Sequence, residues 1–190
     1  MAFLNDLKTQ TAPQHEALES QMDIVRHFAS RTSYLQLIER FFTLYEPLED
    51  RLARAVRWED KGWDFENRRK TPWLRQDLAA LGLNPREISA LPRCADIPGI
   101  PGEAEAVGCL YVLEGSTLGG QVITRLLGRH LEIPPEHGGQ FFSGYGPQTG
   151  PNWKKFGEWA EAWASRHPEQ ESAAIRCAQQ TFDSFSRWFQ

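Results

Sequence analysis

The chain has 190 residues, a length that suits one domain with a sizeable buried core. Its 25 acidic and 21 basic residues give a net charge of −4, so the global cationic field that recruits nucleic acid is missing. Three widely spaced cysteines make a poor disulfide framework and a poor zinc site, and we expect a reducing compartment. The first ten residues lack the pattern of a signal peptide, and no stretch reaches the roughly 18 apolar residues of a membrane span. We therefore expect a cytoplasmic protein.

Apolar residues recur at helical spacing along nearly the whole chain, without strand-like alternation, repeats or a linker. A first helix is predicted to begin at residues 11–14, where Thr11 and Gln14 can form a capping box and Pro13 suits the first turn. His15 is expected to point inward from that turn. It belongs to one stripe at spacings of three and four residues, with Leu7, Thr11, Leu18 and Met22.

A second helix is predicted to begin at residues 33–36, where Ser33 precedes Gln36 at capping-box spacing. Its apolar positions continue to about residue 52, and Pro47 is expected to kink or split it. The charged segment 58–70 that follows predicts a polar loop.

Thr71 and Pro72 restart a helix, with Pro72 in the first turn and Gly82 as its stop. A short helix is predicted to follow from Asn84 and Pro85. Residues 94–102 hold two prolines and two glycines and are expected to be irregular.

The longest helical pattern covers residues 103–131, yet Gly115, Gly119 and Gly120 lie in its middle. Each glycine lowers helix stability by about 1 kcal/mol relative to alanine, so three of them within one helix need a structural or functional explanation. A long loop over 132–152 and two helices, at 152–166 and 168–188, complete the chain. The pattern predicts an all-α bundle of about seven helices in a single domain, residues 1–190.

Two interpretations of the three glycines stay open from spacing alone. They allow two helices to pack closely, or they allow a helix backbone to approach a bulky ligand. His15 is equally ambiguous, because a lone inward histidine is commonly a satisfied core residue, although one imidazole suffices to ligate a haem iron. The other histidines are interpreted as structural or solvated: His27, His130, His137 and His167.

Motifs of other enzyme classes are missing from the sequence. It contains no Glu-x-x-His pair of the kind used by di-iron bundles, and no HExxH, GxSxG, P-loop or GxGxxG motif. Hydrolysis, phosphoryl transfer and nicotinamide chemistry therefore have no support here.

The run YVLEGSTLGGQVI at 111–123 resembles the distal helix of haem oxygenases, especially bacterial enzymes that make biliverdin, including those associated with bacteriophytochromes. The run LKTQTAPQH at 7–15 resembles their proximal helix, and the spacing of about a hundred residues between the two runs also suits that family. The similarity extends to TPWLRQDL at 71–78 and to Phe141 and Phe142, so it covers the whole chain.

The resemblance implies an enzyme that cleaves haem b, which is both cofactor and substrate, to biliverdin, CO and ferrous iron. It implies that His15 ligates the iron, and that Gly115, Gly119 and Gly120 let the distal helix lie against the other haem face with room for O₂. It further implies an external reductase or ferredoxin as electron donor, with no membrane or nucleic-acid partner. Where the product serves as a chromophore, a bacteriophytochrome would receive it.

The sequence departs from the animal enzymes at one catalytic position. They carry an aspartate just after the first distal glycine, where this chain has Ser116, and some bacterial members also lack the aspartate. A serine hydroxyl can anchor water in a different way, so proton delivery is in doubt. For the haem propionates, Lys154 matches a family contact by position, with Lys155, Arg125 and Arg129 as alternatives.

Two rival interpretations remain. The first is a haem carrier or sensor on the same fold without turnover, which Ser116 keeps open. The second is another enzyme on a similar scaffold, such as a thiaminase-like hydrolase, for which Cys109 is the nearest candidate nucleophile.

Overall fold

The computed structural model describes residues 2–190, and over that range the fold is all-α, as predicted. Seven α-helices in the described part have ten or more residues, two are shorter, and no strand occurs there. The long helices are α1 (Ala2–Gln21), α2 (Arg31–Ala55), α3 (Thr71–Ala80), α5 (Glu103–Gly115), α6 (Gly120–Leu131), α8 (Thr149–Arg166) and α9 (Glu171–Trp188). The short ones are α4 (Pro85–Ala90) and α7 (Gln140–Ser143).

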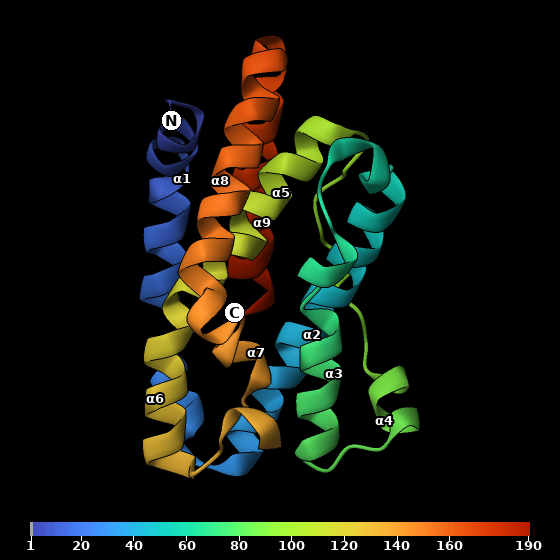
Figure 1. Ribbon diagram of the computed structural model, residues 1–190. Helices are drawn as coiled ribbons and strands as arrows, with labels where there is room; N and C mark the ends of the chain where they lie inside the picture. Colours follow the sequence, from blue (N-terminus) through green and yellow to red (C-terminus); the bar gives the residue numbers. More distant parts are fainter. Residues whose placement is uncertain (1) are drawn as a thin grey trace.

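Helices α1, α5, α8 and α9 run side by side, and α6 lies below them (Figure 1). Helices α2 and α3 pack against each other next to this group. Helices α5 and α9 approach each other closely, since a Cβ added to Gly108 would lie 1.9 Å from the carbonyl oxygen of Ala174. Glycine at this position therefore lets the two backbones touch. The buried apolar side chains form one continuous core cluster between these elements.

The predicted start of the first helix was wrong, because α1 already begins at Ala2 and contains Pro13 in its interior. Thr11 caps nothing: its buried hydroxyl donates to the Leu7 carbonyl at 2.7 Å, one turn back inside the helix. Phe3 and Leu7 are buried in the core, and their packing extends the helix upstream of the Thr-x-Pro pattern. His15 consequently lies in the fourth turn of α1.

The second helix begins three residues earlier than predicted. Ser30 is its N-cap and forms the capping box with Ser33, each side chain accepting from the other's backbone N–H at 3.1 Å. Pro47 does not split α2, which continues to Ala55. Tyr45 and Leu48, on either side of the proline, are fully buried, so tertiary packing holds this part of the helix in place.

Segment 58–70 is far less polar in its environment than its sequence indicates. It forms two 3-10 turns, Trp58–Lys61 and Glu66–Arg68, and the Trp58 and Phe65 rings stack with their centroids 4.9 Å apart. Lys70 at its end is buried as well. The prediction of a loop missed these contacts because the burial depends on partners from distant helices.

The middle of the chain follows the predictions closely. Helix α3 ends before Gly82, which has a positive φ of 109°, and α4 begins with a capping box from Asn84 to Glu87. Residues 94–102 are irregular. The expected loop over 132–152 holds α7 and two 3-10 turns, Pro135–His137 and Gly146–Gln148, and α8 begins three residues before the predicted 152.

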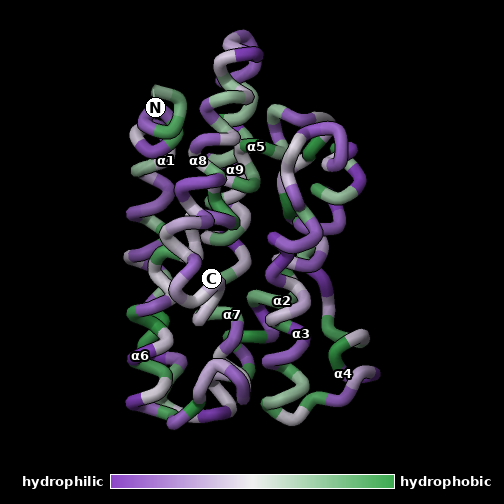
Figure 2. Tube along the Cα trace, in the orientation of Figure 1, coloured by the Kyte–Doolittle hydropathy of each residue, from purple (hydrophilic) through white to green (hydrophobic). Residues whose placement is uncertain are grey.

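Most of the long helices carry hydrophobic and hydrophilic residues together (Figure 2), whereas α5 is buried along nearly its whole length. Within residues 2–190, no helix is long and apolar enough to span a bilayer.

Candidate functional site

A cavity of about 1030 Å³ opens between α1, the 3-10 segment Ile24–Ala29, the junction of α5 and α6, α7 and α9. Its lining is largely apolar and aromatic. Among the sequence-predicted site residues it brings together His15, Gly115, Ser116, Gly119 and Gly120. A volume of this size, walled mainly by apolar and aromatic side chains together with polar ones from α1 and the junction of α5 and α6, is typical of sites that hold a large organic ligand.

His15 lies on the wall of this cavity, and its side chain is 52% exposed. Its stripe neighbours Leu7, Thr11 and Leu18 are buried. His15 therefore interrupts the buried face of α1 at the place where the helix borders the cavity. The ring meets the edge of Phe182 on α9 at 5.6 Å between centroids. Nδ1 lies 3.5 Å from a carboxylate oxygen of Glu19, one turn further along α1.

The glycine-rich segment divides one long helical pattern into three pieces. Helix α5 ends at Gly115, a 3-10 turn covers Ser116–Gly119, and α6 starts at Gly120. We call the segment 115–120 the helix break. It lies on the cavity wall, where a change from α to 3-10 geometry marks a strained or functional position.

The three glycines serve different purposes. A Cβ on Gly120 would lie 2.1 Å from the Phe142 carbonyl oxygen, so Gly120 is required for packing. A Cβ on Gly119 would meet nothing within 4 Å, and one on Gly115 would be in ordinary contact with the Trp153 ring at 3.6 Å. The packing interpretation therefore applies to Gly120, and the approach of a ligand to the backbone at Gly119 stays a prediction.

Ser116 carries one of the two hydroxyls of the helix break, and Thr117 carries the other. The Ser116 hydroxyl donates to the Leu113 carbonyl at 2.9 Å and lies 2.8 Å from the Tyr45 hydroxyl. Tyr45 comes from α2, is fully buried, and also borders the cavity. Burial raises the pKa of Tyr45 well above its ordinary value of 10.0, so its proton stays in place at neutral pH.

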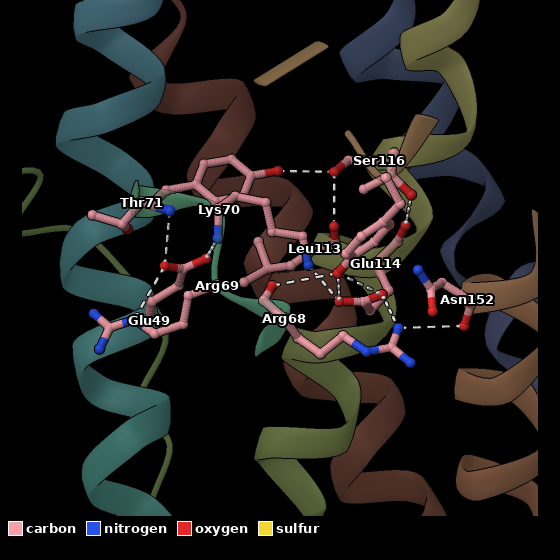
Figure 3. A network of polar contacts seen from close by, with 12 residues as sticks. Glu49, Arg68, Arg69, Lys70, Thr71, Leu113, Glu114, Ser116 and Asn152 are labelled. Atoms are coloured by element: carbon pink, nitrogen blue, oxygen red, sulfur yellow. Dashed lines mark hydrogen bonds and ion pairs between the residues drawn. The ribbon is translucent and has the colours of Figure 1, made fainter. Parts of the chain in front are cut away.

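A buried charged network lies directly behind the helix break (Figure 3). Glu114, with a side chain 1% exposed, is paired with Lys70 and with Arg68, whose Nη1 lies 3.0 Å from its carboxylate. The Tyr145 hydroxyl donates to the same carboxylate at 3.0 Å. Beside this network, and outside it, lies a second buried carboxylate, Glu49, which accepts from the Lys70 backbone N–H at 2.6 Å and makes no hydrogen bond to the Lys70 ammonium.

Comparison with known proteins decides the family. The family model described as "Heme oxygenase" matches residues 1–190. The chain belongs to the haem oxygenase family.

Two relatives support the assignment. A "Heme oxygenase" of Xanthomonas campestris pv. campestris (strain 8004) is 38% identical over 96 residues, which cover 50% of this chain and 53% of the relative. The match thus spans about half the length of that curated relative. The crystal structure of the NO- and CO-bound haem oxygenase of Neisseria meningitidis superposes with a TM-score of 0.81 at 23% identity, over 98% of this chain and 89% of that one. This second likeness shows that the haem oxygenase fold is shared.

The basic residues that the sequence offered for the haem propionates are not among the residues that line the cavity of this haem oxygenase family member. The Lys154 side chain is 79% exposed, pairs with Glu158 at 3.7 Å, and is not among the cavity-lining residues, nor are Lys155, Arg125 and Arg129. Lys8 lines the cavity instead. It precedes His15 by seven residues, and this two-turn spacing on one helix face was the signal that could have identified it.

Tyr45 was also missed, and no sequence signal distinguishes it from the other apolar positions of α2. Cys109, the candidate nucleophile of the hydrolase interpretation, is fully buried, and burial raises the pKa of its thiol well above 9.0. A thiol in this environment is inert, so it gives the hydrolase interpretation no support.

Proposed function

We propose that this chain is an active haem oxygenase that cleaves haem b to biliverdin, CO and ferrous iron, with electrons from an external donor. The observation that carries the proposal is one cavity bordered both by a half-exposed histidine and by the glycine helix break. Family membership supports the reaction, and the open space beside Gly119 supports a ligand that approaches the backbone closely.

The residues present fit haem. His15, with Glu19 beside Nδ1, would ligate the iron through Nε2. The apolar wall, including Phe182 and Phe141, would cover the macrocycle. When bound, haem supplies the iron at which O₂ is reduced and the ring that is opened.

Ser116 and Tyr45 would organise water at the distal side. Because the Ser116 hydrogen goes to the Leu113 carbonyl, the Tyr45 hydroxyl donates to Ser116, and both hydroxyl hydrogens are occupied. The pair then offers the cavity only acceptor lone pairs. Water held there donates to the pair, and proton delivery would proceed through such water and not through a carboxylate.

Three further assignments complete the proposal. Lys8, which lines the cavity, is the better candidate than Lys154 for a propionate contact, because Lys154 lies away from the cavity and pairs with Glu158. The chain has no recognisable flavin or ferredoxin motif, so a cytoplasmic reductase or ferredoxin would supply electrons. A bacteriophytochrome would accept the product where biliverdin serves as its chromophore.

An absorption time course tests the proposal. Purified protein receives one equivalent of haemin and is followed before and after ascorbate or a reductase is added in air. Loss of the Soret band with growth of a broad red absorption, followed by isomer analysis of the product, is expected. A Soret band that survives reduction would instead favour a haem carrier or sensor, the second candidate, which the missing distal carboxylate at Ser116 keeps open.

A further inference from the structure

Glu114 is a buried carboxylate that the proposed reaction does not use. It immediately precedes Gly115, it is not among the cavity-lining residues, and its side chain is 1% exposed. Three groups donate to it: the Lys70 ammonium, Arg68 Nη1 at 3.0 Å, and the Tyr145 hydroxyl at 3.0 and 3.3 Å to the two oxygens. Every acceptor oxygen is therefore satisfied within the network.

The network joins segments that are far apart in the sequence. Lys70 and Arg68 come from the turn before α3, and Tyr145 comes from the segment between α7 and α8. Arg68 also reaches the Asn152 carbonyl of α8 at 3.4 Å, as Figure 3 shows. Glu114 is the residue through which these segments hold the end of α5.

The backbone of Glu114 takes part in the helix break itself. At the end of α5 the Ser116 backbone N–H donates to the Glu114 carbonyl, and two hydroxyls of the break donate to the last carbonyls as well. Thr117 Oγ1 donates to the Glu114 carbonyl at 2.7 Å, and Ser116 Oγ donates to the neighbouring Leu113 carbonyl at 2.9 Å. A shift of Glu114 would therefore move the acceptor that orients Ser116.

A buried ion pair is a poor source of stability, because apolar residues of similar volume often serve as well. Its better-supported use is to select one arrangement where several are close in energy. The helix break is such a place, since three glycines within six residues leave its backbone free to adopt others.

We propose that Glu114 is a positioning residue that acts through Ser116. Clamped by Lys70, Arg68 and Tyr145, it fixes the end of α5 so that the Ser116 hydroxyl stays between the Leu113 carbonyl and Tyr45 and faces the cavity. Its consequence for turnover rests on the proposed function, but its effect on the helix break does not.

A double-mutant cycle tests the route through Ser116. The variants are Glu114→Gln, Ser116→Ala and the double variant, and the measured quantity is the pH midpoint of the alkaline spectral transition of each ferric haem complex. Glu114→Gln is expected to shift the midpoint by about half a unit or more in the parent, and by much less once Ser116 is alanine. Equal shifts in both backgrounds, or none in either, would overturn the proposal.

Hydrogen exchange of the haem-free protein provides an arm that does not depend on haem. Glu114→Gln and the milder Tyr145→Phe, which removes a single hydroxyl donor, are expected to speed exchange of the amides of residues 115–120 by about tenfold. Glu49→Gln is the matched control. Glu49 is equally buried but accepts from the backbone of Lys70 and Thr71, so its substitution should leave these amides unchanged.

The two arms separate the failure of this inference from that of the proposed function. If the parent protein binds no haem, the proposed function fails and the exchange experiment alone decides the role of Glu114. Unchanged exchange in both Glu114→Gln and Tyr145→Phe, or an equal increase in Glu49→Gln, would show that the network does not hold the helix break.

Discussion

The hydroxyl of Tyr45 on α2 lies 2.8 Å from the hydroxyl of Ser116 in the helix break. The two residues are 71 positions apart in the sequence, and both border the cavity. Ser116 would otherwise be a single mobile hydroxyl at a flexible turn. Its bonds to Leu113 and Tyr45 give it one orientation, which is how a neutral side chain can hold water without a carboxylate.

Tyr45→Phe tests this pair. Loss of the hydroxyl frees Ser116 to rotate, so haem turnover should fall by about tenfold, with haem affinity little changed because the apolar ring remains. Steady-state turnover and a haem titration measure the two quantities. Tyr34→Phe is the control: Tyr34 is also fully buried, but donates to the Gly138 carbonyl and does not line the cavity. An equal loss of turnover in both variants would contradict the role of Tyr45.

The helical fold could be predicted because apolar spacing is a local property of the sequence. The limits of α3 and α4 were predicted for the same reason, since Pro72, Gly82 and Asn84 act within one turn. The start of α1 was mistaken because Thr11 and Pro13 make a good local start, and the packing of Phe3 and Leu7 overrides it. Local signals compete with tertiary contacts, and the contacts prevailed there.

The site was predictable only in part. His15 and the glycines were found because they are unusual in their own helices. Lys70 was assigned to a polar loop because its buried partner Glu114 is 44 positions away, and Tyr45 looks like any apolar residue of α2. Pairings of this kind depend on the fold and have no local signature.

His15→Ala tests the assignment of the iron ligand. The variant is expected to bind haem more weakly and to lose turnover, because no other histidine lines the cavity among the described residues. Added imidazole should restore both in part. The absorption spectrum of the haem complex and the rate of biliverdin formation are the measurements, with His130→Ala as control, since His130 lies exposed near the end of α6. Parental turnover in His15→Ala without imidazole would exclude the assignment.

Asp77 should make stability depend on pH. Its buried carboxylate accepts from the Gln140 and Phe141 backbone N–H groups, and burial raises its pKa from 3.8 to about 6. The folded state therefore holds this proton more tightly than the unfolded chain, so the contribution of Asp77 is greatest below pH 3.8 and is lost as the pH rises through 6. The loss amounts to about 3 kcal/mol.

Urea unfolding of the parent and of Asp77→Asn measures this contribution. The parent's free energy of unfolding, minus that of the variant, should fall by about 2.5 kcal/mol between about pH 4 and pH 7, because the unfolded chain is already partly ionised at pH 4. Taking the difference cancels the titration of groups that the two proteins share. A difference that does not change with pH would show that the Asp77 carboxyl titrates alike in the folded and unfolded states.

Gly119→Ala and Gly120→Ala separate packing from ligand approach within the helix break. At Gly120 a Cβ would lie 2.1 Å from the Phe142 carbonyl oxygen, a backbone atom that cannot move without shifting α7. Gly120→Ala should therefore destabilise the protein by about 3 kcal/mol or more. At Gly119 nothing lies within 4 Å and φ is −75°, so alanine fits and should stabilise the haem-free protein by about 0.5–1 kcal/mol.

The two variants should therefore affect different properties: Gly119→Ala changes haem affinity or turnover, and Gly120→Ala changes stability. Gly119→Ala adds a methyl group to the cavity wall, so its haem affinity or turnover should fall although its thermal midpoint does not. Gly120→Ala should show a lowered thermal midpoint whether or not haem is present. Parental haem affinity and turnover in Gly119→Ala would mean that the open space beside Gly119 is not used by the ligand, and the glycine there would be explained by backbone geometry alone.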